Sequence, residues 1–331
     1  MATTLTISSL LISFIITLII TPYWIKRARD HNLVAKDMHK PGKKAAELGG
    51  LCVICGFLAG ILYYIAIDVF VYGNASYAKF MFAAISSILI ATIIGLTDDI
   101  LGWKLGLRQY QKVILTIAIV FPMMVINAGQ STMSFPFFGR YDLGLWFPLL
   151  IVPIGIIGAS NGFNMMAGYN GLEAGMGIII LSTLGYISFA IGSEWVALMA
   201  FCMVAALAAF LVFNKYPARV FPGDTLTYSV GALIAIVAIL GNMEKFALII
   251  FTPYFIECVL KARGKMQKES FGKVLKDGSL AIPYKKYYGL EHVFIALIRK
   301  IKKRAYEYEV VLSLWGLQII VALFTVIYFL F

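Results

Sequence analysis

Charged residues are scarce in this chain. Asp, Glu, Lys and Arg make up 14% of its 331 residues, whereas they make up about a quarter of an average soluble domain. Hydrophobic residues reach 61%. A soluble chain of this length folds as one or two domains, and neither could bury so much apolar surface. The shortage of charge therefore excludes an ordinary soluble protein and indicates a membrane protein.

Cysteine and histidine are also few. The sequence has 4 Cys and 3 His. Cys52 and Cys55 form a C-x-x-C pair, but the pair lies in an apolar run with no second pair and no nearby histidine. The histidines, at positions 31, 39 and 292, show no ligand spacing. The sequence thus lacks the pattern of a zinc site, and the thiols are read as structural.

Long apolar runs fill most of the remaining sequence. A helix needs about 20 mostly apolar residues to cross a bilayer, and unbroken runs do not suit the alternating strands of a barrel. The sequence predicts an all-α polytopic membrane protein, one integral membrane domain over residues 1–331. Ten spans are expected near residues 4–24, 48–68, 79–96, 112–128, 146–160, 173–191, 194–213, 225–241, 245–260 and 310–330.

Two further features complete this expected architecture. Residues 1–9 contain no early basic residue and no small-residue cleavage site, so the first apolar run is expected to be a retained span. Residues 131–142 read as a small extracytoplasmic β-hairpin. The last cytoplasmic loop, 261–309, is expected to be long.

Basic residues are distributed very unevenly. The chain has 28 Lys and Arg against 17 Asp and Glu, a net charge of +11. With ten spans, all basic residues except Lys79, Arg140 and Lys245 fall in loops on one side. The positive-inside rule makes that side cytoplasmic and places both termini outside. The excess charge is therefore a topology signal, and nucleic acid is not an expected partner.

Ionisable residues at membrane depth are candidates for function, and here they lie at the cytoplasmic ends of spans. Asp98 and Asp99 directly follow an apolar run. Adjacent carboxylates repel each other and suit metal, phosphate or proton chemistry, although a plain helix-end pair is the alternative. Lys112 stands where the next span begins, shortly after Arg108.

Three polar segments join these acids on the same side. Residues 161–173 interrupt two spans with three Asn, three Gly and one Glu. Glycine permits close backbone approach, and amide oxygens coordinate hard cations. Residues 219–224 place Asp224 at the start of a helix, where an N-cap is the plain alternative. Residues 36–50 are basic and suit phosphate, although positive-inside bias explains the lysines equally well.

The segments together predict one hard divalent ion, held by few carboxylates and completed by substrate phosphates, as Mg²⁺ usually is. The implied chemistry is phosphoryl transfer at the membrane surface. The competing class is an ion-coupled transporter of an anionic solute. Such carriers place their sites near the bilayer midplane in broken helices with internal repeats. This sequence shows no repeat, and its polar clusters lie at one surface.

Three of these motifs resemble those of a known family. Asp98-Asp99, the segment from Asn161 to Gly175 and the segment Arg219 to Asp224 look like those of the polyprenyl-phosphate N-acetylhexosamine-1-phosphate transferases, of glycosyltransferase 4 type. The resemblance covers nearly the whole chain. The Asn-Gly-Leu-Glu-Ala-Gly form is most similar to archaeal and eukaryotic UDP-GlcNAc–dolichyl-phosphate GlcNAc-1-phosphotransferases, whereas bacterial members usually have Asp-Gly-Leu-Asp-Gly.

The resemblance implies an activity. A sugar-1-phosphate, in the first place GlcNAc-1-phosphate, passes from a UDP-sugar to a polyprenyl or dolichyl phosphate in the membrane lipid, and UMP is released. This is the first step of lipid-linked oligosaccharide assembly for protein glycosylation. A cytoplasmic site and Mg²⁺, with Mn²⁺ as the alternative ion, are also implied. A homodimer is left open. Direct attack by the lipid phosphate and a two-step route through an aspartyl intermediate both remain open.

The resemblance also suggests roles for residues. Asp98, Asp99 and Lys112 match the catalytic group, and the lysine position, to which Arg108 could also align, contacts the lipid phosphate. Asn164 and Asp224 match metal ligands. Substrate-binding residues, with Phe221 as an aromatic near uracil, are expected at Lys36, Asp37, Met38, Glu47, Asn170, Gly171, Glu173, Phe221, Gly223, Arg263 and Lys268.

The last cytoplasmic loop departs from the family pattern. Family members carry Arg-His-Arg or His-x-His there, near the sugar and pyrophosphate, and residues 261–309 have no such motif. The nearest equivalents are Arg263, Lys265, Lys268 and His292. This departure bears on the identity of the sugar more than on the reaction.

Overall fold

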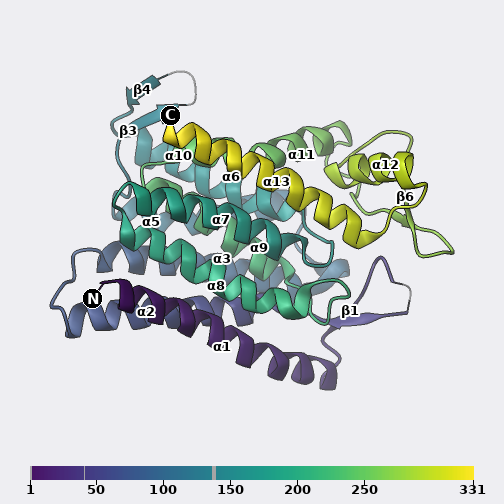
Figure 1. Cartoon of the computed structure of the whole chain (residues 1–331), viewed down its shortest axis with the longest axis horizontal. Helices are drawn as coiled ribbons and strands as arrows, with labels where there is room; N and C mark the ends of the chain where they lie inside the picture. Colours follow the sequence, from purple (N-terminus) through teal and green to yellow (C-terminus); the bar gives the residue numbers. More distant parts are fainter. Residues whose placement is uncertain (1, 41, 136–138) are drawn as a thin grey trace.

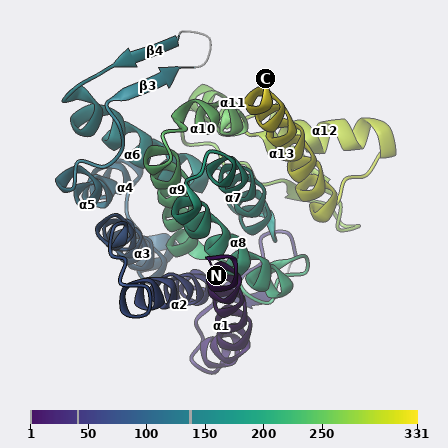
Figure 2. The same ribbon diagram turned by 60° about the vertical axis from the view of Figure 1, so that its left-hand side comes forward.

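The computed structural model describes residues 2–40, 42–135 and 139–331. It is a bundle of helices with short hairpins at its two ends (Figures 1 and 2). The helices are α1 (Ala2–Asp30), α2 (Gly50–Phe70), α3 (Ala78–Leu105), α4 (Gln109–Thr116), α5 (Phe121–Val125), α6 (Val152–Met165), α7 (Leu172–Ala190), α8 (Glu194–Asn214), α9 (Gly223–Leu240), α10 (Glu244–Ile250), α11 (Thr252–Arg263), α12 (Leu290–Lys302) and α13 (Glu307–Leu330).

The remaining elements are short. A 3₁₀ turn, η1 (Ile117–Val120), joins α4 to α5, and a π-helical turn, η2 (Phe147–Ile151), precedes α6. Three antiparallel pairs are formed by β1 (Val34–Lys36) with β2 (Lys44–Ala46), β3 (Thr132–Phe135) with β4 (Gly139–Asp142), and β5 (Lys273–Val274) with β6 (Leu280–Ala281).

Among the described residues, eight helices are long and apolar enough to cross a membrane. The mostly helical, polytopic architecture is therefore confirmed, and the protein is an integral membrane protein. These helices cover Thr4–Asp30, Gly50–Phe70, Ala78–Gly102, Phe147–Met165, Leu172–Ala190, Glu194–Asn214, Gly223–Leu240 and Glu307–Leu330.

Two of the ten predicted spans form broken helices instead. The expected span 112–128 is the shorter stretch Gln109–Val125, made of three pieces. The expected span 245–260 is divided at Phe251 into α10 and α11, with Pro253 in the first turn of α11. Proline lacks an N–H group and ends the preceding helix. The count of ten spans stays a prediction.

The two ends of the bundle differ. The β3–β4 hairpin and both termini lie toward one end in Figure 1, while β1, β6 and α12 lie toward the other. The predicted hairpin at 131–142 pairs Thr132 with Asp142, and its residues 136–138 lie outside the described residues. The orientation of these two ends in a membrane stays a prediction.

Close backbone approach positions the site. Helix α9 is almost wholly buried and packs against α3 and α6. A Cβ atom at Gly95 would collide with the backbone of Asp224 and Thr225, and one at Gly231 with the backbone of Ala159. Small residues at these crossings let helices approach closely in a membrane. The ends of α3, α6 and α9 therefore meet at one place.

Candidate active site

A cation between two carboxylates forms the centre of the site. The Lys112 ammonium lies 2.7 Å from Asp98 Oδ2 and 2.7 Å from Asp224 Oδ2. Helices α3, α4 and α9 each supply one of these side chains. The two acids would repel each other without the ammonium. The geometry thus brings together three residues that the sequence expected to share a site.

The adjacent acids Asp98 and Asp99 act on different partners. Asp99 accepts the backbone N–H groups of Asp224 at 2.8 Å and Thr225 at 3.0 Å, and the Thr225 hydroxyl at 2.7 Å. It therefore caps the N-terminus of α9 from another helix, where a negative charge is favourable. Gly223 has φ +72°, and a Cβ there would collide with the Asp99 carboxylate.

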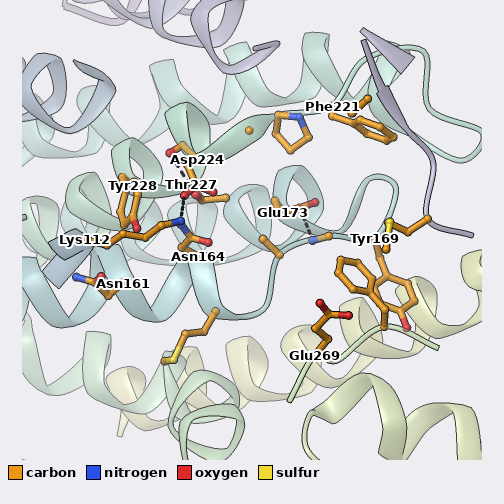
Figure 3. Close-up of a pocket in the computed structure, with 18 of the residues that line it drawn as sticks. Lys112, Asn161, Asn164, Tyr169, Glu173, Phe221, Asp224, Thr227, Tyr228 and Glu269 are labelled. Atoms are coloured by element: carbon orange, nitrogen blue, oxygen red, sulfur yellow. Dashed lines mark hydrogen bonds and ion pairs between the residues drawn. The ribbon is translucent and has the colours of Figure 1, made fainter. Parts of the chain in front are cut away.

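The asparagines of residues 161–173 also have different surroundings. Asn161 donates to the Thr116 hydroxyl and to the Ile157 carbonyl, at 2.9 Å each, so it holds α4 against α6. Asn164 lies beside Lys112 and Asp224 in the cavity (Figure 3). Asn164 therefore faces the place where a substrate would bind.

The cavity has a volume of about 640 Å³ and opens between several loops. Eleven predicted site residues line it: Lys36, Asp37, Met38, Lys112, Asn164, Asn170, Glu173, Phe221, Gly223, Asp224 and Lys268. Five predicted residues do not line it: Asp98, Asp99, Glu47, Gly171 and Arg263.

Those five residues have other surroundings. Asp98 Oδ1 accepts the Leu107 N–H at 2.6 Å, which fixes the chain after α3. Burial and then the nearby Asp99 charge raise the pKa of Glu47. Gly171, at φ +84°, precedes α7 and lies against Leu211. Arg263 is exposed in the last turn of α11.

Glu173 presents a carboxylate oxygen to the cavity region. Its Oε1 accepts the Gly168 N–H at 2.6 Å. Within the described residues its buried Oε2 has no hydrogen-bond partner. A buried polar atom without a partner is costly, so Oε2 is suited to meet a hydrogen-bond donor on a ligand.

A buried ionic network, here the Glu307 network, holds Asn170 in place. It consists of Asp37, Lys40, Asn170 and Glu307. Asn170 donates its backbone N–H to Glu307 Oε1 at 2.8 Å and its amide group to Asp37 Oδ2 at 3.1 Å. The Lys40 ammonium joins the two acids, 2.8 Å from Asp37 Oδ2 and 3.3 Å from Glu307 Oε2. This network ties the loop between α1 and α2 to the start of α13.

Glu307 is not recognisable in this role from the sequence. It follows a basic stretch and precedes an apolar run, so it reads only as an acidic first turn of a helix. Asn170 and Glu307 are 137 residues apart. His39 was likewise not predicted as a site residue. The centre of its ring lies 4.4 Å from that of Tyr169 and 5.6 Å from that of Phe271, and both ring pairs are tilted.

The loop between α11 and α13, residues 264–306, contributes one wall of the cavity. Met266, Gln267, Lys268, Glu269 and Phe271 line it. The Glu269 carboxylate points into the cavity (Figure 3). From the sequence, only basic residues and a histidine of this loop were expected at the site, so Glu269 was not predicted.

Fold and site together define an integral membrane protein with a polar cavity, built around a lysine–carboxylate cluster, at one end of its helix bundle. Residues 80–242 match the family described as glycosyl transferase family 4. The chain belongs to this family, and it is a transferase.

Relatives agree over nearly the full length. The chain is 38% identical over 321 residues to a protein of Saccharolobus solfataricus and 32% identical over 323 residues to one of Sulfolobus acidocaldarius, covering 96% and 97% of this chain and 95% of each relative. Both are provisionally named UDP-N-acetylglucosamine–dolichyl-phosphate N-acetylglucosaminephosphotransferase. A phospho-N-acetylmuramoyl-pentapeptide-transferase of Halalkalibacterium halodurans is 31% identical over 284 residues, covering 78% of this chain and 84% of the relative.

Proposed function

We propose that this protein transfers a sugar-1-phosphate, in the first place GlcNAc-1-phosphate, from a UDP-sugar to a polyprenyl or dolichyl phosphate and releases UMP. The observation that carries this proposal is the Lys112 ammonium held between Asp98 and Asp224 beside a polar cavity. The names of the relatives support both the donor and the acceptor.

The chain's own residues supply binding and orientation. Lys112 attracts the anionic lipid phosphate, and Asp98 and Asp224 hold its ammonium in position. A lipid phosphate oxygen attacks the β-phosphorus of the donor, and the bond from that phosphorus to the bridging oxygen of UMP breaks. The acceptor is already largely ionised near neutral pH, so Asp98 need only orient it or accept a residual proton. Fixed charges of this kind favour the transition state.

The proposal includes Mg²⁺, with Mn²⁺ as the alternative ion. Asn164 and Asp224 would hold it, because amide and carboxylate oxygens are hard donors and Mg²⁺ takes few protein ligands besides phosphates. Lys112 engages Asp224 Oδ2, which leaves Oδ1 for another ligand. When bound, the ion would neutralise charge between the two donor phosphates.

The site is proposed to face the cytoplasm, with both termini on the other side. Support comes from the lysines that line the cavity, Lys36, Lys112, Lys261 and Lys268. Positively charged loops are retained in the cytoplasm. A homodimer stays an expectation of the family resemblance.

The test is release of UMP by the purified protein given UDP-GlcNAc, Mg²⁺ and a polyprenyl phosphate. UMP should appear together with a lipid-linked GlcNAc pyrophosphate, and omission of either the lipid phosphate or the metal should prevent both. Absence of UMP with a range of UDP-sugars and lipid lengths would refute the proposal and favour a carrier of anionic solutes.

A further inference from the structure

The cavity wall formed by the last cytoplasmic loop carries an uncompensated negative charge. Glu269 lines the cavity, and its carboxylate points inward on the side where Tyr169 lies (Figure 3). The side chain is exposed to solvent. No other residue in the described part of the chain forms a hydrogen bond or ion pair with this carboxylate.

The other acids that line the cavity already have partners. Asp224 is paired with Lys112, and Asp37 accepts from Lys40 and Asn170. Glu173 accepts the backbone N–H of Gly168 with Oε1, while its Oε2 is buried without a partner among the described residues. Glu269 is the solvent-exposed acid of the cavity, and in the described part of the chain neither of its carboxylate oxygens has a partner.

The basic groups of the same wall point to other partners. The Lys268 ammonium lies 5.3 Å from the centre of the Tyr284 ring, a distance at which a cation is attracted to an aromatic face. The Lys261 ammonium lies 3.7 Å from Glu257 Oε1. The charge of Glu269 is therefore not neutralised by the lysines closest to it in sequence.

The position of Glu269 relative to Phe221 suggests what it meets. A nucleotide-sugar is a diphosphate with two arms, a nucleoside and a sugar. Lys112 and Asp224 mark the phosphate end of the cavity, and Phe221 and Glu269 lie on opposite sides of it (Figure 3). If the base lies against Phe221, the sugar arm faces the wall that contains Glu269.

We propose that Glu269 makes the donor site selective for an uncharged sugar. Its carboxylate accepts hydrogen bonds from sugar hydroxyl groups and repels sugars that carry a carboxylate of their own. Like charges within a few ångströms disfavour the wrong ligand. The inference rests on the proposed function and adds the class of sugar to it.

The test compares donors that differ in charge. UDP-GlcNAc is neutral in its sugar, the same donor oxidised to a carboxylate at C6 is acidic there, and UDP-N-acetylmuramic acid is acidic at its lactyl group. The wild type should prefer UDP-GlcNAc in kcat/KM. Glu269→Gln should reduce the ratio of kcat/KM for the neutral donor to that for an acidic donor by about tenfold, and Glu269→Lys should reduce the ratio further. The difference between wild type and variant should become smaller as salt is added, because salt screens exposed charges.

Asp277→Asn is the matched control. Asp277 is a solvent-exposed acid of the same loop that does not line the cavity, so its loss should leave the donor preference unchanged. Equal kcat/KM for the neutral and the acidic donors in the wild type, or the same preference in the wild type and Glu269→Gln, would overturn the inference while UDP-GlcNAc transfer continued. If the wild type transferred from no UDP-sugar, the proposed function itself would fail and the inference with it.

Discussion

At the scale of single residues, the site depends on which way neighbouring side chains point. Successive residues of a helix are turned by about 100°. Asp98 therefore meets Lys112 while Asp99 meets the start of α9. Two adjacent acids therefore have different roles. Asp98 pairs with Lys112 beside the cavity, and Asp99 stabilises the start of α9.

Exchanging the two acids for amides should separate these roles. Asp98→Asn should lower kcat by about 10²-fold with little change in the thermal midpoint. Asp99→Asn should lower the stability by about 1–3 kcal/mol, because an amide NH₂ group cannot accept the N–H groups of α9. Turnover and thermal unfolding of both variants in detergent are the measurements. Normal turnover of Asp98→Asn across pH would contradict its assignment as base or orienting group.

Lys112 and Arg108 can be distinguished in the same way. Lys112→Gln leaves two carboxylates facing each other beside the cavity and should lower turnover by about 10²–10³-fold. Arg108 is exposed and does not line the cavity, so Arg108→Gln should leave at least half of the activity. Steady-state kinetics with saturating lipid phosphate decide between them, and the reverse order of effects would assign the lipid phosphate to Arg108.

At the scale of elements, contacts between loops and helices hold the donor end of the cavity. Asp37 belongs to the loop between α1 and α2 and Glu307 belongs to α13, yet both bind Asn170. Burial alone would raise the pKa of Asp37, but hydrogen bonds from Lys40, Asn170 and the His39 N–H outweigh it, and the pKa is lowered. The charged form of Asp37 therefore stabilises the folded protein.

The sign of this shift predicts a pH dependence. An unfolded aspartate has a pKa of about 3.9, and the folded value is lower. The stabilisation is complete above the unfolded pKa and is lost as the pH falls through the folded pKa. Asp37→Asn should lower the apparent thermal midpoint at pH 7, and the difference from the wild type should shrink below about pH 4. A constant difference down to pH 3 would contradict this.

The α1–α2 crossing offers a test of helix packing. Ser13 and Thr17 are fully buried on α1, and a Cβ at Gly56 of α2 would collide with the Thr17 hydroxyl. Gly56→Ala should cost about 1–3 kcal/mol through overpacking. Gly316→Ala, in α13 with open space around it, should be neutral or stabilising because alanine favours a helix. Thermal unfolding in detergent checks both, and equal effects would refute close packing at Gly56.

At the scale of the whole molecule, the bundle separates two surfaces. One end carries the β3–β4 hairpin and the termini, and the other carries β1, β6 and α12 (Figure 1). Residues of β1 and of the loop that follows α11 line the cavity. A membrane protein with its basic loops at one end is expected to keep that end in the cytoplasm. The cavity and the basic loops then lie on the same face of the membrane, the face where phosphate donors are expected.

Labelling in intact cells tests this sidedness. The two variants are Arg140→Cys and Asp277→Cys. Arg140 lies on β4 and Asp277 lies in the loop between α11 and α13, and both residues are exposed. A membrane-impermeant maleimide should label position 140 in intact cells and position 277 only after the cells are opened. The wild type, whose four cysteines are unpaired, sets the background. Labelling in the reverse order would invert the orientation.

The sequence by itself determined the membrane class, the approximate position of most long helices and the segments that carry the cavity. These features follow from local composition. About 20 consecutive apolar residues are stable as a helix across the bilayer, and the polar residues at their ends then lie at the membrane surface. Asn164, Glu173 and Asp224 could be found in this way. The broken helices at 109–125 and 244–263 were less predictable, since apolar content alone does not show where proline divides a span.

Only the tertiary structure decided which of these residues meet. The split between Asp98 and Asp99 depends on the rotation of α3 against α9, and the bond between Asn170 and Glu307 joins positions 137 residues apart. The inward direction of Glu269 depends on how the last loop folds against Tyr169, whose ring stacks with Phe271 of that loop. Such contacts are set by packing between distant segments, and no local pattern in the chain encodes them.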